Sequence, residues 1–572
     1  MKFFIKKIYI ALFLVTILLI HFKVYAKDSE IQYARKNISN YFSGIISLNQ
    51  HYDNQAYKYL KKVESIKNKH SNFNIEFIKT LVLLEKFDKA FSFSKSIWDE
   101  DELLFEADLL LGLESFLNKD YLSAKRYFKR LNKTSRYNLF FDEFIGNVLI
   151  AWVEAAKGNK EDSFNFIEKV AKPYRHLAKI QNTFLHCYFD LDKDQEFFKE
   201  LIQDESYDFS RYNFFLLNYL LFKNNPEEAK KLIRKGTRKN NSSLLIKQTE
   251  KLLINNDYNK IKNFFNCKNP EDVIAEFFYV LANIYSSEKD YKMSNFYLKI
   301  SLFLNQKFLP NKALLAENFY YQKKYKLSKN IYFSLKTIGQ IYAWYAEKNI
   351  SSILLKTEGK ENSVKNLESE FNSIKNPNFE HYYEMANFYK DNEYYNESIK
   401  YYSLALDEIT KDHFLFPKIL DRRGTSFERL GDWKNAEKDL IKSLEILPDQ
   451  PHVINYLAYT WVDKGINLDQ GLEMLKKANE LRKNDGYIMD SLGWAYYAKK
   501  NYIEAEKYLQ KAVELLPFDP IINDHYADAL WMSEKNIQAR YFWGHDLKLD
   551  TTEQKLKDLI NEKLIFGINR KL

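Results

Sequence analysis

The chain has 572 residues, of which 46% are hydrophobic and 28% are charged, so it can bury a continuous core. Only 15 glycines and 10 prolines are available for turns and domain boundaries, which favours long helices joined by short loops. The formal net charge of +9 is spread along the chain without a basic block, and this argues against nucleic acid as a partner.

Residues 1–26 have the pattern of a secretory signal peptide, because three lysines precede the apolar run 8–20 and Val24-Tyr25-Ala26 follows as a cleavage signal. The apolar run is shorter than the roughly 20 residues that span a bilayer. We therefore expect an exported, periplasmic protein. Anchoring to the inner membrane by residues 3–22 is the alternative. Cleavage would remove four lysines and no acid, lowering the net charge from +9 to +5.

Residues 27–270 show an irregular helical repeat. Pairs of small or apolar residues, twelve residues apart, recur at intervals of 34 to 39 residues: Gly44/Ala56, Ile78/Ala90, Gly112/Ala124 and Ala151/Ser163. Between about 171 and 270 the clearest helix start is "NNPEEAKKLI", with Asn225 as the cap and Pro226 at the first position. We expect degenerate repeats in this region, with a possible hinge.

Residues 271–548 repeat more regularly, with small residues in two parallel series at steps of 34 to 38 residues. Small side chains at both positions allow helix axes to approach to about 8 Å. The first series is Ala282, Ala316, Ser351, Ala386, Gly424, Ala458, Gly493 and Ala527, and the second is Ser294, Ser328, Ser363, Ser398, Ala436, Gly471, Ala505 and Ala539.

The stretch from Tyr487 to Pro517, "YIMDSLGWAYYAKKNYIEAEKYLQKAVELLP", resembles the tetratricopeptide repeat (TPR) through Leu492-Gly493, Tyr496, Ala505, Ala512 and Pro517. This resemblance implies an all-α fold in which antiparallel helix pairs stack into a right-handed α-solenoid, a superhelix whose concave face is lined by the first helix of each pair. The residues expected to pack the repeats are Gly424, Ala436, Ala458, Gly471, Gly493, Ala505, Ala512, Ala527 and Ala539.

The end of the chain, residues 549–572, contains the amphipathic stretch "TTEQKLKDLINEKL". We expect it to form a capping helix that covers the apolar end of the last repeat. The block 455–550 also looks like secreted repeat proteins of alphaproteobacteria, which would make the protein a component of the cell envelope.

The chain has two cysteines, Cys187 and Cys267, which lie more than two repeats apart. At about 8–10 Å for each packed helix layer their separation should be roughly 20 Å, beyond the limit of about 7 Å for a disulfide. We therefore expect free thiols.

The sequence gives little room for catalysis, because nearly every segment after residue 30 can be assigned to a helical repeat. No Gly-rich phosphate loop, His-Glu-x-x-His helix, Gly-x-Ser-x-Gly elbow or Cys-x-x-Cys pair occurs. Asp524, His525 and Asp528 lie within one helical turn and could present metal ligands, but we interpret them as a polar face. We expect no enzyme activity, cofactor, metal or small-molecule substrate.

The inferred concave face of the last repeats is aromatic and acidic, a composition suited to anchoring an extended peptide that is basic or rich in amides. The alternative, that these aromatic residues only pack between helices, stays open. The basic clamp that some TPR proteins use for C-terminal carboxylates is missing, because Asp421, Thr425, Tyr456, Tyr487 and Ser491 occupy its positions. The predicted groove residues are Asn455, Tyr456, Tyr459, Asp490, Ser491, Trp494, Tyr497, Asp524, Asp528 and Trp531.

These observations predict a non-catalytic scaffold that binds partner proteins or peptides in its groove, in the cell envelope. A second hypothesis is a regulatory or substrate-docking subunit of an envelope polysaccharide or peptidoglycan enzyme complex. A third, catalysis by the chain itself, would require a metal or a reactive group at Asp524 and His525.

Overall fold

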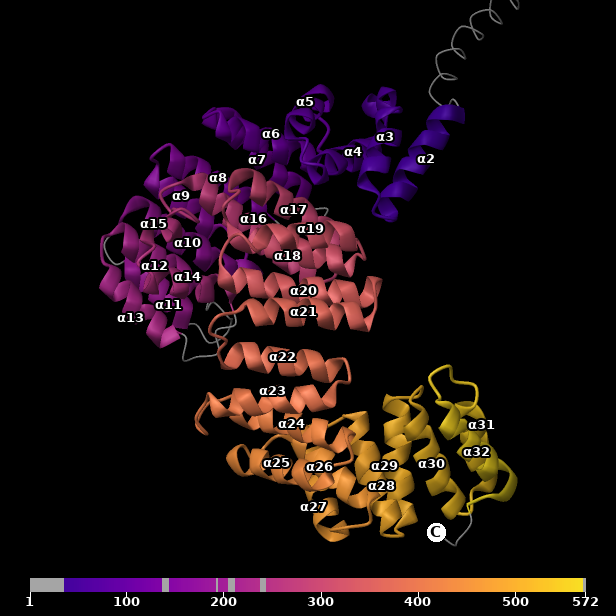
Figure 1. Ribbon diagram of the computed structural model, residues 1–572. Helices are drawn as coiled ribbons and strands as arrows, with labels where there is room; N and C mark the ends of the chain where they lie inside the picture. The colour runs from indigo at the N-terminus through magenta and orange to yellow at the C-terminus, as the bar shows by residue number, and fades with distance from the viewer. Residues whose placement is uncertain (1–34, 136–142, 192–193, 204–210, 237–242, 569–572) are drawn as a thin grey trace, which may run out of the picture. The chain divides into compact units, whose positions relative to one another are not determined.

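The computed structural model describes residues 35–135, 143–191, 194–203, 211–236 and 243–568, and these residues form α-helices joined by short turns, with no β-strand among them (Figure 1). The expected signal peptide and the alternative anchor, residues 3–22, lie outside these ranges. Within them, every helix is too short or too polar to cross a membrane.

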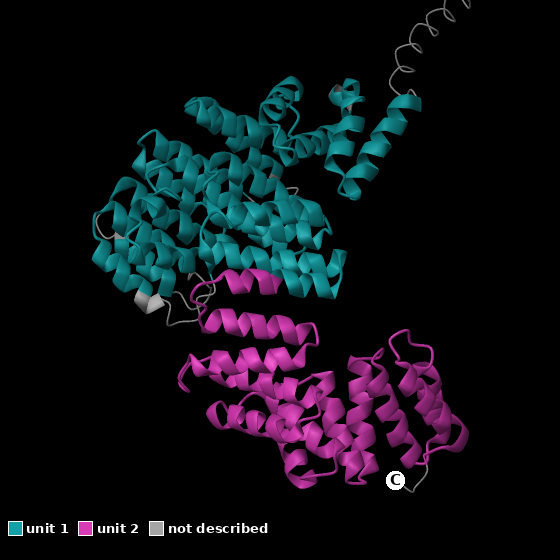
Figure 2. Cartoon of the chain, in the orientation of Figure 1, with its two compact units in different colours: residues 1–366 teal, residues 367–572 magenta. Residues whose placement is uncertain are grey.

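The chain divides into two compact units, residues 1–366 and residues 367–572 (Figure 2). The division falls inside helix α21 (Lys360–Ser373), whereas the sequence pattern changes near residue 270.

The remaining helices of unit 1, together with two 3-10 helices at Glu64–Lys69 and Lys172–Tyr174, have the following bounds. They are α2 (Arg35–Asn49), α3 (Asp53–Lys61), α4 (Ser71–Leu83), α5 (Phe87–Ile97), α6 (Phe105–Leu117), α7 (Tyr121–Ser135), α8 (Phe144–Ala156), α9 (Lys160–Glu168), α10 (Arg175–Phe189), α11 (Asp194–Gln203), α12 (Tyr212–Phe222), α13 (Pro226–Gly236), α14 (Leu244–Ile254), α15 (Tyr258–Lys262), α16 (Pro270–Ser287), α17 (Tyr291–Leu304), α18 (Leu309–Tyr321), α19 (Tyr325–Leu335) and α20 (Gln340–Thr357).

The helices of unit 2 follow one another as stacked pairs (Figure 1). They are α22 (Phe379–Asp391), α23 (Tyr395–Asp407), α24 (Phe416–Arg429), α25 (Trp433–Ile446), α26 (Pro451–Asp463), α27 (Leu468–Leu481), α28 (Gly486–Ala498), α29 (Tyr502–Leu515), α30 (Pro520–Met532), α31 (Asn536–Asp546) and α32 (Gln554–Phe566).

Each of these helical hairpins has a residue of left-handed conformation, with a positive φ, one or two positions after its first helix ends. In the hairpin α28–α29 this residue is Lys500, and the N–H of Asn501 then donates to the carbonyl of Tyr496 at 2.9 Å. The series, which marks fifteen hairpins, is His51, Glu85, Lys119, Gly158, Asp190, Asn224, Asn256, Lys289, Lys323, Gly359, Glu393, Gly431, Gly465, Lys500 and Glu534. The hairpin α26–α27 has a second such residue, Asn467.

The repeat continues through residues 171–270, where the sequence pattern is weak, because three of these turns lie there. The predicted helix start is confirmed: α13 begins at Pro226, and the side-chain oxygen of Asn225 accepts a hydrogen bond from the N–H of Glu228 at 3.3 Å.

Small residues lie where the two helices of a hairpin meet. A Cβ added to Gly493 would lie 2.6 Å from Cγ of Leu509, so only glycine fits there without a shift. At three of the four serines of the second series, the hydroxyl donates to the carbonyl of the small residue in the first helix, as Ser294 does to Ala282 at 2.7 Å and Ser328 to Ala316 at 2.8 Å. The fourth, Ser398, donates to the carbonyl of Tyr395 in its own helix.

Unit 1 also makes contacts between helices that are far apart in sequence. Helix α4 packs against α17, and the rings of Phe87 and Phe303 stack with their centroids 4.1 Å apart. The ammonium of Lys292 lies 2.7 Å from a carboxylate oxygen of Glu76. The array in this unit therefore folds back on itself.

The prediction of free cysteines was wrong, because Cys187 and Cys267 form a disulfide with a Cα–Cα distance of 6.0 Å. The estimate of their separation assumed that every repeat adds full helix layers. Helix α15 has only five residues, and the segment after it returns across the earlier hairpins. There Phe265 packs against Phe184 at a centroid distance of 5.4 Å, which brings Cys267 to the end of α10.

Candidate functional site

The predicted groove residues lie on three successive first helices of unit 2, namely α26, α28 and α30. They fall into two groups by burial. Asn455, Tyr456, Tyr459, Trp494, Tyr497 and Trp531 are partly exposed, whereas Asp490, Ser491, Asp524 and Asp528 are buried.

Three aromatic residues of α26 and α28 form what we call the aromatic platform, made of Tyr459, Trp494 and Tyr497 with the ring of His525. Trp494 stacks on Tyr497 at a centroid distance of 4.6 Å and on His525 at 4.0 Å, with interplanar angles of 6° and 14°. The ring of Tyr459 lies 6.5 Å from His525. The platform is thus preorganised by contacts between neighbouring repeats.

The carboxylates behind the platform are already engaged within the chain. Nδ1 of His525 lies 2.9 Å from Oδ1 of Asp490. Burial lowers the pKa of His525, but the charge and hydrogen bond of Asp490, with smaller effects of Asp524 and Asp528, outweigh it and raise the pKa above its usual value. The imidazole therefore gains a proton more readily than a free histidine.

Asp524 and Asp528 hold the C-terminal helix α32. Nζ of Lys563 on that helix lies 2.8 Å from oxygens of both carboxylates, and Asp528 also accepts from Nε1 of Trp543 at 3.1 Å. Burial and the neighbouring Asp524 raise the pKa of Asp528 to about 6. These buried acids are structural, so ligand selection by free carboxylates is not supported at these positions.

The cluster Asp524, His525 and Asp528 is split between two partners. The imidazole faces Asp490, and the two carboxylates face Lys563. In the part of the chain that the structure describes, no three side chains of the ligating types are placed to hold a metal ion.

Trp531 belongs to the packing of the chain end rather than to the platform. Its ring lies 5.4 Å from that of Trp543, and the guanidinium of Arg540 lies 5.5 Å from its ring centroid. A Cβ added to Gly567, after α32, would lie 2.1 Å from Trp531, so this glycine lets the chain pass close to the indole ring.

The residues expected to pack the repeats are all at the helix contacts of unit 2. Each of the alanines among them, Ala436, Ala458, Ala505, Ala512, Ala527 and Ala539, has no exposed surface. A Cβ on Gly424 would lie 3.1 Å from the carbonyl oxygen of Ala436, and one on Gly471 would lie 3.1 Å from Val462.

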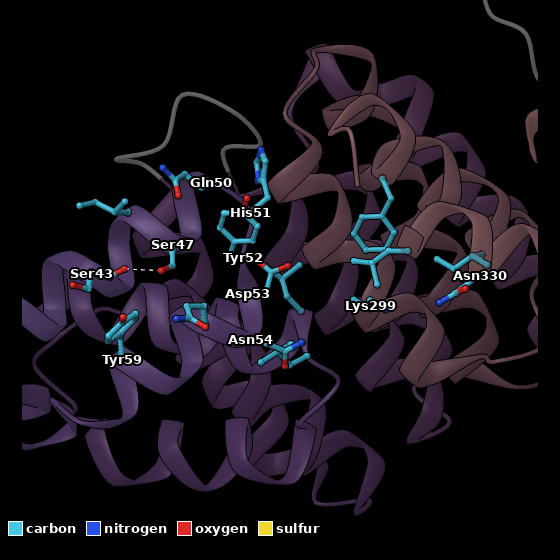
Figure 3. Close-up of a pocket in the computed structure, with 17 residues that line it drawn as sticks. Ser43, Ser47, Gln50, His51, Tyr52, Asp53, Asn54, Tyr59, Lys299 and Asn330 are labelled. Carbon is cyan, nitrogen blue, oxygen red and sulfur yellow. Dashed lines mark hydrogen bonds between the residues drawn. The ribbon is translucent and has the colours of Figure 1, made fainter. Parts of the chain in front are cut away.

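Sequence reasoning missed a second candidate site, a cleft of about 930 Å³ within unit 1. Figure 3 shows side chains of α2 and α3 on one wall and, across the cleft, Lys299 of α17 and Asn330 of α19. The walls are more than 200 residues apart in the chain, so no local sequence pattern marks them.

The comparisons with known proteins agree with the repeat. The family profile of the tetratricopeptide repeat matches residues 487–519. The TPR repeat-containing protein PA4667 of Pseudomonas aeruginosa is 31% identical over 113 residues, which are 20% of this chain and 19% of that protein. The match therefore spans about a fifth of that relative's length.

Among solved structures, MamA from Desulfovibrio magneticus RS-1 is 16% identical with a TM-score of 0.28, over 32% of this chain and 99% of that one. A tetratricopeptide repeat protein from Parabacteroides merdae is 17% identical with a TM-score of 0.33, and the match covers 39% of this chain and 85% of that one. A chain of the APC/C hetero-tetramer Cut9–Hcn1 is 13% identical with a TM-score of 0.36, and the match covers 92% of this chain and 96% of that one. These scores support no inference about partners.

Proposed function

Because this chain contains tetratricopeptide repeats, a fold that generally mediates contacts between proteins, we propose that it is a non-catalytic scaffold that binds a partner polypeptide on the inner face of its C-terminal unit. Helical hairpins account for most of the described residues, and this supports a binding role over catalysis.

The observation that carries the proposal is the aromatic platform. Large aromatic side chains that are partly exposed yet held in one orientation bind a partner with little loss of conformational entropy. Trp494 is held by stacking on Tyr497 and His525, and His525 is held in turn by Asp490. The acids fix the aromatic residues, and the aromatic residues contact the partner.

We further propose that the protein acts after export, in the periplasm or anchored at the inner membrane by residues 3–22. The disulfide Cys187–Cys267 supports this, because disulfides persist in oxidising compartments and are rare in the cytosol of mesophiles. The charged and apolar pattern of residues 1–26 points to the same compartment.

The test is capture of partners from envelope extracts by the tagged protein, compared with a variant carrying Tyr459→Ala and Trp494→Ala. Trp531 is left unchanged because it packs the chain end. A matched control is Ile503→Ala, since Ile503 is 80% exposed on α29, the second helix of its hairpin. The proposal predicts that the wild type and the Ile503→Ala control capture one or more partner proteins that the double variant does not capture. An identical set of captured proteins for all three would refute it.

A further inference from the structure

The cleft of unit 1 differs from the aromatic platform of unit 2 in how it is built. Besides α2, its walls include the second helices of two hairpins, α3 and α19, which lie far apart in the chain. An ion pair joins the two sides, because Nζ of Lys324 lies 2.8 Å from Oδ2 of Asp53. The cleft is therefore a defined site and not a gap between neighbouring repeats.

The floor of the cleft is aliphatic and aromatic. Leu83 and Leu84 close it from α4 and the turn that follows, and Phe319 and Ile331 close it from α18 and α19. At the rim, Leu327 on α19 is 45% exposed and Tyr52, before α3, is 63% exposed. This apolar surface is available to bury the side chains of a ligand.

The polar groups of the lining are mostly uncharged. Its two ions are already paired: Asp53 with Lys324, and Lys299 with Glu85. Burial and the charge of Lys324 lower the pKa of His51 despite the nearby Asp53, so its imidazole gains a proton less readily than that of a free histidine. A ligand that carried a net charge would find no free counter-ion among these described groups.

The remaining polar groups of the lining are carboxamides and hydroxyls, and carboxamides lie on both walls. The hydroxyls belong to Ser43, Ser47, Tyr52 and Tyr59, and Gln55 adds a further carboxamide on the side of α3. Gln50 and Asn54 line one wall and Asn330 lines the other (Figure 3). Among the residues that the structure describes, no side-chain hydrogen bond engages these three amides. A carboxamide offers both donors and an acceptor, as a peptide group does, so it can pair with a main chain of any sequence.

We propose that this cleft is a second binding site, which takes an extended, uncharged polypeptide segment with apolar side chains. The amides of Gln50, Asn54 and Asn330 bind its main chain, and the aliphatic floor takes its side chains. Glycans also bind to tyrosines and amides, but aliphatic residues dominate this floor and favour a peptide.

The test is a selection on the purified full-length protein with a displayed library of random linear peptides. The selected peptides should be uncharged and apolar in their binding segment. Their affinity should fall at least tenfold for Leu327→Arg and also for Tyr52→Ala, because the ligand touches both walls. Both side chains are exposed, so circular dichroism should show an unchanged fold.

Two controls separate this site from the aromatic platform. Ile537→Arg, at a residue that is 85% exposed on α31, and the variant Tyr459→Ala with Trp494→Ala should both bind the selected peptides as the wild type does. Loss of binding in the platform variant would assign the peptides to the aromatic platform and overturn the proposal. Selected peptides that carry a net charge would also overturn it, as would peptides whose affinity is unchanged by Leu327→Arg and Tyr52→Ala. A third contrary outcome is a selection that yields no peptide while a glycan array shows that the cleft binds sugars.

Discussion

The space for a single methyl group decides how closely the two helices of a hairpin pack. In α28 a Cβ on Gly493 would lie 2.6 Å from Cγ of Leu509 and 3.1 Å from its backbone nitrogen. Around Gly544 of α31, by contrast, no heavy atom lies within 4 Å of an added Cβ apart from Gly544 itself, its chain neighbours and the backbone of its own helix. The same substitution therefore meets opposite surroundings in two helices of one unit.

We predict that Gly493→Ala lowers the free energy of unfolding by about 1–3 kcal/mol, because overpacking at the helix contact outweighs the gain in helix propensity. Gly544→Ala should leave stability unchanged or raise it by up to about 1 kcal/mol. Urea unfolding followed by circular dichroism measures both. Equal effects of the two variants would contradict the packing account.

The small residues could be predicted from the sequence because their period is visible, but the turn residues could not. Most hairpins turn on lysine, glutamate, aspartate or asparagine, as at Lys289 and Glu534, in a conformation that costs such residues only about 1–2 kcal/mol. Packing of the two helices offsets this conformational free energy, so a glycine is not required at the turn. The sequence therefore shows few of the glycines that would mark its turns.

At the scale of elements, helix α32 is held by charge as well as by its apolar face. The sequence predicts an amphipathic helix here, and Ile560 is indeed fully buried. It does not reveal that Lys563 reaches Asp524 and Asp528, because these residues are 35 or more positions apart and only the stacked fold brings them together. Because the sequence does not show this lysine beside them, Asp524 and Asp528 are predicted from the sequence alone to face a ligand.

A buried carboxyl group makes the stability of this end depend on pH. Both oxygens of Asp546 lack hydrogen-bond partners among the described residues, and burial together with the charges of Asp524 and Asp519 raises its pKa to about 8, despite Lys563. Because the pKa is raised on folding, the stabilisation is complete below the unfolded value near 4 and is lost as pH rises toward 8.

We therefore predict that unit 2 loses stability between pH 5 and about 8, on the order of a few kcal/mol, and that Asp546→Asn flattens this dependence. Asp528, whose pKa is raised to about 6, contributes in the same direction. Thermal unfolding of wild type and variant across this pH range gives the measurement. A variant with the same pH slope as the wild type would rule out Asp546 as the cause.

At the scale of the whole molecule, contacts between distant repeats decide what the sequence can reveal. A repeat pattern predicts which helices are neighbours in the chain, and the helical hairpins of both units follow it. It contains no information on how far unit 1 folds back, which brings α4 to α17 and creates the cleft. Nor does the pattern reveal that the chain returns from the short helix α15 to the end of α10, which is why the disulfide was missed.

We predict that reduction of the disulfide destabilises unit 1 selectively. Removal of a native disulfide typically costs about 2–5 kcal/mol, and Cys187 and Cys267 both lie in this unit. Calorimetry of the full chain, with and without reductant, should show one unfolding transition shifted to lower temperature and the other unchanged. Titration of the unfolded, unreduced protein with a thiol reagent should find no free thiol. Two free thiols would contradict the disulfide.

The most direct test of the central claim, that the aromatic platform holds a partner polypeptide, is photo-crosslinking in living cells. A photoreactive phenylalanine analogue is placed at position 459 or 494, and at position 503 on the second helix as a control. The account predicts a discrete adduct with another polypeptide from positions 459 and 494 and none from 503. No adduct from the two platform positions, or an equal adduct from position 503, would contradict it.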